Sequence, residues 1–379
     1  MINRKIIIIG GGVIGLGIGW QLAKAGASVS LFERDQVGRG ASWAAAGMLA
    51  PLAEAHTEET ELLELGVKSL SLYPQWVDEL ETDAQMSIDY RVEGTLIVGL
   101  EPDDTHQLSH LYAAQQQMNL NVNWLTGREA REIEPTLSPR VTAAIHCASD
   151  HQVDNRLMVN ALQRAYIACS GMLHENSSVE GVVIKEGTVT GVLVEDGTQK
   201  CDVVVLAAGC WSAQIKGIPE TLCPPIRPVK GQMLALQMEG GVKVETVIRT
   251  VRARYPTSVY LVPRNDGRLI VGATSEEMGF DTRLTVGGIF ELLRGAWETV
   301  PGVYELPILD TWAGLRPGSR DNAPILGKTP VENLIYATGH YRNGILLTPI
   351  TAYEISKLIM TGETSDIIEP FQLNRFSTE

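Results

Sequence analysis

The N-terminal part of the chain carries the pattern that most constrains its fold. A β-branched run at Lys5–Ile9 predicts a strand buried on both faces, and helical spacing of apolar residues over Ile14–Ala25 predicts a helix that ends at Gly26. The sequence GGGVIG lies between them, and a second strand is expected at Ser28–Phe32. This order predicts a βαβ unit with parallel strands, the frame of a dinucleotide-binding domain.

The glycines of this unit each have a physical task. Gly10 suits the tight turn, Gly12 lets the backbone approach a pyrophosphate, and Gly15 lets the helix pack closely on the strand. The helix N-terminus presents free N–H groups and a positive dipole end to the phosphates. A carboxylate at Glu33, just after the second strand, can accept hydrogen bonds from both ribose hydroxyls and selects against NADP. A glycine-rich turn without a ligand is the alternative, and the unit alone does not distinguish NAD from FAD.

The same stretch also has the length and flanking charges of a membrane span or a signal peptide. Residues 6–23 are uncharged and lie between Lys5 and Lys24. Their many glycines lower both hydrophobicity and helix propensity, and a further strand follows instead of a cleavage site. The βαβ unit explains all of these features, so we expect no membrane association.

Charge and cysteine content exclude further classes of function. The formal net charge of −14 argues against nucleic acid and against an anionic membrane surface as partners. The five cysteines form no CxxC pair, which predicts a reduced, cytoplasmic chain and no metal site.

Three later segments favour FAD over NAD. Small residues crowd the segment 38–48, where Ser42 could offer a hydroxyl to a phosphate; simple helix packing is the alternative. An apolar strand at Asp202–Leu206 leads into AAGCWS, and residues 334–349 predict a strand, a glycine-containing loop and a helix start. That helix would point its positive end at a ligand in the loop. No second GxGxxG occurs, so the substrate itself should reduce the flavin.

Together these segments resemble the D-amino acid oxidase superfamily of FAD-dependent amine oxidases and, within it, the glycine oxidases of thiamin biosynthesis. The matching stretches are GGGVIG with FER, GASWAAAGML, AAGCWS, YLVPRNDGRLIVGAT, TWAGLRPGSRDNAPILG and GHYRNGILLTP. The resemblance implies an α/β fold in which a Rossmann-type FAD-binding domain is interleaved with an antiparallel-sheet substrate domain. The FAD-binding domain would comprise residues 1–82, 145–222 and 312–379, and the substrate-binding domain residues 83–144 and 223–311.

The periodicity of the chain agrees with this architecture. Residues 91–100 and 259–273 alternate like strands, and the N-D-G sequence in the second stretch predicts a hairpin.

The resemblance also implies roles for individual residues. Arg316 would bind the substrate carboxylate through its guanidinium fork, Tyr260 would donate its hydroxyl to the same group, and Arg342 would lie beside the flavin. Without the resemblance, an Arg before Pro-Gly is typical of a surface turn, and a Tyr in a strand is typical of packing. The residues expected at the substrate pocket are Met48, Ser258 and Ser275; the two serines depart from the His and Met that glycine oxidases tend to carry there.

The cofactor would be held by residues from all the matching stretches. The expected cofactor-binding residues are Gly10, Gly12, Val13, Ile14, Gly15, Glu33, Arg34, Ser42, Ala46, Gly47, Met48, Val179, Ala208, Gly209, Trp211, Arg316, His340, Arg342, Asn343, Gly344, Ile345 and Leu346. No cysteine lies beyond Cys223, so the FAD should be bound non-covalently, unlike the flavin of sarcosine oxidase relatives.

The resemblance implies oxidative deamination of glycine and other small amines or D-amino acids. Hydride transfer to flavin N5 would give an imine that hydrolyses to glyoxylate and ammonia, with oxygen as acceptor and hydrogen peroxide as product. The biological setting would be thiazole formation in thiamin biosynthesis, with a functional link to thiazole synthase, and relatives suggest a homotetramer. Two alternatives stay open: a dehydrogenase that passes electrons to a quinone or another carrier, and a flavin-binding subunit active only in a complex.

Overall fold

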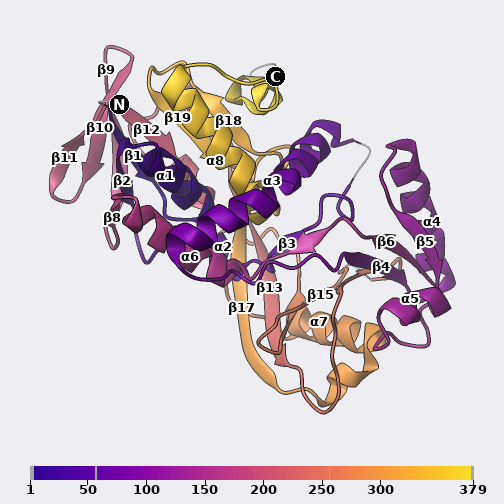
Figure 1. Ribbon diagram of the computed structural model, residues 1–379. Helices are drawn as coiled ribbons and strands as arrows, with labels where there is room; N and C mark the ends of the chain where they lie inside the picture. Colours follow the sequence, from indigo (N-terminus) through magenta and orange to yellow (C-terminus); the bar gives the residue numbers. More distant parts are fainter. Residues whose placement is uncertain (1–3, 56–57, 256, 377–379) are drawn as a thin grey trace.

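Two β-sheets of different kinds organise the structure. The computed structural model describes residues 4–55, 58–255 and 257–376. One sheet has six strands in the order β18-β19-β12-β1-β2-β8, and the other has eight in the order β17-β13-β16-β15-β14-β4-β6-β5. In Figure 1 the six-stranded sheet lies with the two labelled termini, and the long strand β17 extends from the eight-stranded sheet toward it.

The six-stranded sheet is parallel except where β18 pairs with β19. Its strands are β1 (Lys5–Ile9), β2 (Ser28–Phe32), β8 (Met172–His174), β12 (Val203–Leu206), β18 (Ile325–Lys328) and β19 (Leu334–Thr338). Four helices cover one face: α1 (Val13–Lys24), α3 (Thr60–Ala84), α6 (Asn155–Ala168) and α8 (Gly344–Thr361). A three-stranded sheet covers the other face, formed by β9 (Val179–Lys185), β10 (Thr188–Val194) and β11 (Gly197–Lys200).

The N-terminal βαβ prediction is confirmed. The two strands have the expected bounds, and the helix begins and ends one residue earlier than expected. Ile6 and Ile8 pack against the helices while Ile7 and Ile9 pack against the three-stranded sheet, which explains why the whole strand is apolar. Gly26 follows the helix with φ +83°, a conformation that favours glycine.

The eight-stranded sheet is antiparallel except where β14 pairs with β4. Its strands are β4 (Thr95–Gly99), β5 (Asn123–Thr126), β6 (Ala143–Cys147), β13 (Arg227–Gln237), β14 (Val247–Val251), β15 (Tyr260–Pro263), β16 (Arg268–Gly272) and β17 (Ile308–Gly318). The flanking helices are α4 (Pro102–Gln117), α5 (Gly127–Ile133) and α7 (Val286–Thr299). The predicted N-D-G hairpin is confirmed as the turn between β15 and β16, with Gly267 at φ +89°.

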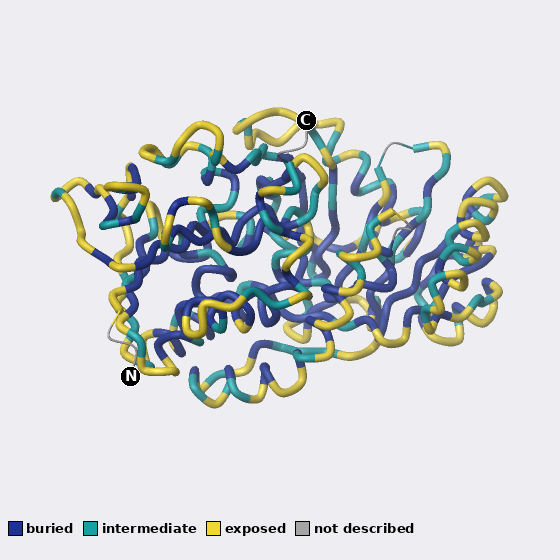
Figure 2. Tube along the Cα trace, turned by 90° about the horizontal axis from the view of Figure 1, so that it is seen from above, coloured by how far each residue is buried: buried dark blue, intermediate teal, exposed yellow. Residues whose placement is uncertain are grey.

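The remaining elements are short. They are α2 (Ala41–Ala44), β3 (Met48–Leu49), β7 (His151–Gln152) and the 3₁₀ turns Gly209–Gln214 (η1), Glu220–Leu222, Pro301–Glu305, Glu369–Phe371 and Leu373–Phe376. One face of the eight-stranded sheet packs on α7, and the other face packs on Ala44 and Ala46. Figure 2 shows buried chain throughout both parts of the molecule and exposed chain at its periphery.

The expected α/β class, with a parallel-sheet part and an antiparallel-sheet part, is therefore confirmed. The domain limits given above remain a proposal: β6 and β17 belong to the eight-stranded sheet, yet each spans one of the proposed boundaries, at residues 144–145 and 311–312. Within the described residues, no helix combines the length and the apolar character needed to cross a membrane.

Candidate active site

A large cavity lies between the two sheets. Its volume is about 680 Å³, and it extends from the carboxyl ends of β1, β2, β12 and β19 to one face of β13, β15 and β17. Ligands of open α/β sheets bind outside the carboxyl ends of the strands, because loops and helix N-termini open there. The cavity is therefore the site at which the expected cofactor and substrate residues can be located.

The glycine-rich segment GGGVIG, residues 10–15, contributes to one part of the cavity wall. A Cβ at Gly10, which has φ +108°, would lie 2.5 Å from the Ala207 carbonyl oxygen, and a Cβ at Gly15 would overlap the Gly10 carbonyl oxygen. Gly12 differs, because a Cβ there would meet only the Ser42 hydroxyl oxygen, at 3.2 Å. Gly10 and Gly15 are thus required by the protein's own packing, whereas Gly12 leaves backbone open toward the cavity.

Two polar side chains hold this loop in place. The Val13 N–H donates to Ser42 Oγ at 3.0 Å, so the Ser42 hydroxyl hydrogen is free to donate toward the cavity. The Gly11 N–H donates to Glu33 Oε2 at 2.8 Å, and the Asp35 N–H donates to Glu33 Oε1 at 3.0 Å. A carboxylate can accept about four hydrogen bonds, so Glu33 can also accept from a ribose.

A second helix N-terminus opens on the cavity at α8. The carbonyl oxygens of Ile345 and Leu346 accept hydrogen bonds from Tyr73 Oη at 2.5 Å and Ser69 Oγ at 2.6 Å on α3. These bonds fix the first turn of α8, whose N–H groups have no partners within the helix. His340 precedes this turn and contacts Thr351 Oγ1 at 3.1 Å. Burial lowers the pKa of His340 to about 3, so its ring is neutral at physiological pH.

The structure brings all but one of the expected cofactor residues to the cavity. Gly15 does not line it and instead lies against Gly10, as described above. At the end of the cavity next to Glu33, the Arg34 guanidinium lies over the Trp211 ring, 4.3 Å from its centroid. The other expected residues on the cavity wall are Gly10, Gly12, Val13, Ile14, Glu33, Ser42, Ala46, Gly47, Met48, Val179, Ala208, Gly209, Arg316, His340, Arg342, Asn343, Gly344, Ile345 and Leu346.

These residues fit FAD on structural grounds alone. Two helix N-termini and a glycine loop free of side chains suit a pyrophosphate and an anionic ring, and the Glu33 carboxylate suits a ribose. The flavin would be held along Ala46–Met48 and the first turn of α8, and the adenosine end near Glu33 and Arg34.

The opposite wall of the cavity is one face of the eight-stranded sheet. Strand register places Arg249, Tyr260, Gly272, Met233 and Trp312 in one row across β14, β15, β16, β13 and β17. Side chains in such a row point to the same face of the sheet. The first four line the cavity or lie directly beneath a residue that does.

Two glycines allow the proposed substrate residues to lie flat on this face. A Cβ at Gly272 would lie 2.5 Å from the ring and hydroxyl of Tyr260, and a Cβ at Gly231 would lie 2.5 Å from the guanidinium of Arg316. Gly231 pairs with Gly314 of β17, and Met233 on the same strand pairs with Gly272 of β16, so the Arg316 and Tyr260 side chains lie on the same face of the sheet. We call Gly231 and Gly272 the floor glycines.

The electrostatics of this pair suit an anionic group. Arg316 Nη1 donates to the carbonyl oxygens of Thr274 at 3.1 Å and Lys230 at 3.4 Å, which leaves other guanidinium donors available. Burial raises the pKa of Tyr260, and this effect exceeds the opposing effect of Arg316. The Tyr260 hydroxyl therefore remains a hydrogen-bond donor at neutral pH. The surface-turn alternative for Arg316 is wrong, because the residue lies within β17.

The remaining expected pocket residues also line the cavity. Met48 is half-buried and packs between two hydrophobic clusters, while Ser258 and Ser275 are exposed at the cavity wall. Arg342 is exposed, and its guanidinium lies 5.2 Å from the centroid of the Tyr341 ring. The positions agree with the expected roles, which stay predictions.

Several charged residues at the cavity were not predicted from the sequence, and Arg249 on β14 is one of them. Arg249 donates to the Ala53 carbonyl oxygen at 2.8 Å and forms an ion pair with Glu54 at 3.4 Å. Asp150, fully buried behind them, accepts from the N–H groups of Leu52 and Ala53. Burial raises the pKa of Asp150 to about 7. Only the alternation of β14 could have indicated that Arg249 faces inward.

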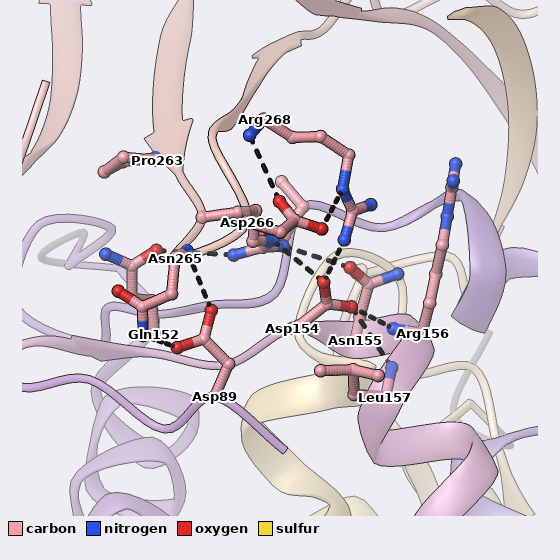
Figure 3. Close-up of polar contacts among 12 residues, drawn as sticks. Asp89, Gln152, Asp154, Asn155, Arg156, Leu157, Pro263, Asn265, Asp266 and Arg268 are labelled. Atoms are coloured by element: carbon pink, nitrogen blue, oxygen red, sulfur yellow. Dashed lines mark hydrogen bonds and ion pairs between the residues drawn. The ribbon is translucent and has the colours of Figure 1, made fainter. Parts of the chain in front are cut away.

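A polar cluster joins the two sheets beside the cavity and was also not predicted (Figure 3). Arg264, 3% exposed, donates to the Ala46 carbonyl oxygen at 2.6 Å and to Asn155 Oδ1 at 3.1 Å. Asp154 caps α6 and accepts from Arg268 at 2.5 Å. The cluster thus fastens the hairpin that bears Tyr260 to α6 and to the segment that lines the flavin site.

Comparisons with known proteins identify the family of the chain. The family model described as FAD dependent oxidoreductase matches residues 5–358. The bifunctional protein ThiO/ThiG of Synechocystis is 38% identical over 99% of this chain and 54% of its own length, so the chain spans about half the length of such curated relatives. The glycine oxidase of Geobacillus kaustophilus is 34% identical over 98% of this chain and 96% of its own.

Solved structures give the same result. The glycine oxidase structure from Bacillus cereus has a TM-score of 0.89, with 30% identity and full coverage of both chains. The fold and the family match together confirm the D-amino acid oxidase-like architecture. The chain belongs to the family of FAD-dependent oxidoreductases of the D-amino acid oxidase type, and FAD is its cofactor.

Proposed function

We propose that the protein is an FAD-dependent amine oxidase that deaminates glycine and other small amines or D-amino acids. The observation that carries the proposal is the convergence of Arg316 and Tyr260 over the floor glycines, on the cavity wall that faces the proposed flavin segment. A guanidinium fork and a phenol hydroxyl offer a carboxylate three donors in a fixed arrangement. The glycine oxidase relatives support the same substrate class.

The protein's part in this reaction is mainly positioning. The bound FAD supplies a hydride acceptor for the α carbon of the amine. Arg316 and Tyr260 hold the carboxylate, and their fixed orientation restricts the directions in which the α carbon can point. We assign no general base, because a neutral amine needs none for hydride loss. The imine product takes up water to give glyoxylate and ammonia, and oxygen takes up two electrons and two protons to give hydrogen peroxide.

The wider setting is part of the proposal. The fusion of ThiO with ThiG in the Synechocystis relative supports a role in thiazole formation and a functional link to thiazole synthase. We further propose that oxygen is the electron acceptor, that the protein forms a homotetramer and that it is located in the cytoplasm.

The test is a stoichiometric assay on the purified holoenzyme. With glycine, anaerobic mixing should bleach the flavin, and aerobic turnover should give one peroxide per glyoxylate. A ratio near zero with turnover restored by a dye acceptor would instead identify a dehydrogenase. Failure to bleach with glycine, sarcosine or D-alanine would overturn the proposed activity and favour a subunit that needs a complex.

The Arg316→Ala variant tests the carboxylate site within this activity. It should keep FAD and raise the KM for glycine by at least about 100-fold, because a charge-assisted bidentate contact contributes roughly 3 kcal/mol or more. Unchanged glycine kinetics would refute the assignment of Arg316.

A further inference from the structure

A cluster of polar side chains lies directly behind Arg316, on the side of β13 that faces away from the cavity. Lys230 and Gln232 alternate with Gly231 and Met233 along β13, so they point to the opposite face of the sheet. Lys230 is 1% exposed and Gln232 is fully buried. Charged and polar groups at such depth need partners.

Glu276 supplies those partners. Its Oε1 accepts from Gln232 Nε2 at 2.8 Å and from Thr274 Oγ1 at 2.5 Å, and its Oε2 lies 3.4 Å from Lys230 Nζ. The main chains of Glu276 and Lys230 also pair, with N–H···O distances of 2.9 and 3.0 Å in the two directions. The Glu276 side chain therefore contacts the side chains of Gln232, Thr274 and Lys230, and its main chain pairs with β13.

The charge state of Glu276 is consistent with this role. Burial raises its pKa, but the hydrogen bonds from Thr274 and Gln232 and the charge of Lys230 outweigh that effect and leave the pKa below its usual value. The side chain is therefore a carboxylate at neutral pH. It balances the buried ammonium of Lys230, which would be costly if unpaired.

The cluster connects to the substrate site through Arg316. The Arg316 guanidinium donates to the carbonyl oxygens of Thr274 and Lys230. Both residues are held by the Glu276 side chain. A shift of either carbonyl would turn the guanidinium, and a fork that binds a carboxylate bidentately tolerates little rotation.

We propose that Glu276 is a positioning residue of the substrate carboxylate site, which sets the orientation of Arg316 by fixing Thr274 and Lys230. The inference rests on the proposed function, because it takes Arg316 as the carboxylate-binding residue. Glu276 itself does not line the cavity, so it acts through its neighbours.

The experiment compares holoenzyme variants by two readouts: the Kd for acetate, titrated against the flavin absorbance, and the steady-state kinetics with glycine. Glu276→Ala should raise both the acetate Kd and the glycine KM about tenfold, with kcat changed less than about twofold, because a carboxylate contact made equally in ground and transition state affects KM alone. Glu277→Ala is the matched control: this neighbour forms an exposed ion pair with Arg227 at 3.0 Å, and both readouts should stay unchanged.

A double variant separates positioning from stability. Glu276→Ala leaves the Lys230 ammonium unpaired and should lower the melting temperature, whereas Lys230→Met in the same chain removes that charge and should restore it. The raised acetate Kd should persist in the double variant. Recovery of the acetate Kd together with stability would overturn the inference, as would an unchanged Kd in Glu276→Ala.

The Arg316→Ala variant, measured in parallel, shows whether a negative result refutes the carboxylate site itself or only the role of Glu276. If it leaves the acetate Kd unchanged, the carboxylate site itself is wrongly assigned and the inference about Glu276 falls with it. If Arg316→Ala weakens acetate binding and Glu276→Ala does not, the proposed site stands and only the role of Glu276 is refuted.

Discussion

The two walls of the cavity use glycine for opposite reasons. In the wall that would hold the cofactor, which includes the GGGVIG segment and is called the cofactor wall below, a Cβ at Gly10 or Gly15 would overlap main-chain carbonyl oxygens. In the opposite wall, which is one face of the eight-stranded sheet, a Cβ at Gly231 or Gly272 would overlap the side chains of Arg316 and Tyr260, respectively. The first pair of glycines therefore allows two backbones to approach, and the second pair allows functional side chains to lie along a sheet.

This difference predicts different consequences of substitution. The main chain at Gly10 and Ala207 directly follows β1 and β12 and is tied to neighbouring strands by hydrogen bonds to the Phe32 and Ile9 carbonyl oxygens. A clash with this main chain therefore lowers stability or weakens cofactor binding. The side chains above the floor glycines can rotate into the cavity, so a clash with them changes the site while the fold survives. Substituting alanine at each position tests the comparison directly.

Gly15→Ala should have the largest effect. The new methyl group would overlap the Gly10 carbonyl oxygen, so α1 would have to move away from β1. We expect a loss of more than about 3 kcal/mol of stability, near the upper end for overpacked sites, and a protein isolated without FAD. Thermal unfolding and the flavin content of the purified protein are the measurements.

Gly187→Ala is the control for the Gly15 experiment. This glycine has φ +79° in the turn between β9 and β10, and a Cβ there would meet nothing within 4 Å. It should cost only the strain of a left-handed residue, roughly 1 kcal/mol, and keep its FAD. A Gly15→Ala protein with the same stability and the same flavin content as this control would contradict the packing argument.

Gly272→Ala should leave the fold and change the chemistry. The methyl group would displace the Tyr260 ring, now 2.5 Å from that position, and move the hydroxyl away from the carboxylate site. A loss of roughly 1–3 kcal/mol of transition-state stabilisation at this contact corresponds to a kcat/KM for glycine lower by about 5- to 160-fold. Steady-state kinetics with fully FAD-loaded enzyme measures the effect.

The double variant Gly272→Ala/Tyr260→Phe identifies the cause. If the alanine acts by displacing the Tyr260 hydroxyl, it should add little once that hydroxyl is absent. Additive losses in the double variant would mean that Gly272 matters for some other reason.

The same contrast explains what the sequence could predict. One part of the cofactor site is local: GGGVIG, its flanking strands and Glu33 lie within one βαβ unit, so spacing alone predicts that unit and a dinucleotide ligand, although not whether the ligand is NAD or FAD. Tyr260 and Arg316 were predicted only through family resemblance, because a single Tyr or Arg in a strand has no distinctive periodicity. The structure shows both at the cavity, and their roles remain predictions.

The residues that sequence reasoning missed share one property. The need for Gly231 and Gly272 arises from side chains on other strands, and the roles of Glu276 and Arg264 arise from partners that only the folded chain brings near. A buried charge is recognisable in a sequence only when its partner lies at a fixed spacing. Here the partners of Arg264 include the carboxylate of Asp154, at 3.6 Å, and the Ala46 carbonyl oxygen, both more than one hundred positions away along the chain.

Gly12→Ala should have the smallest effect and is the sharpest test of the cofactor wall. Its backbone is extended, with φ −75° and ψ 176°, so alanine adds no strain, and its only near contact would be Ser42 Oγ at 3.2 Å. Stability of the apoprotein should therefore change by less than about 1 kcal/mol. The methyl group would point toward the predicted pyrophosphate path, so the Kd for FAD should rise about tenfold, measured by quenching of flavin fluorescence on binding. An unchanged FAD Kd would show that this glycine, unlike Gly10 and Gly15, serves neither the protein's packing nor its cofactor.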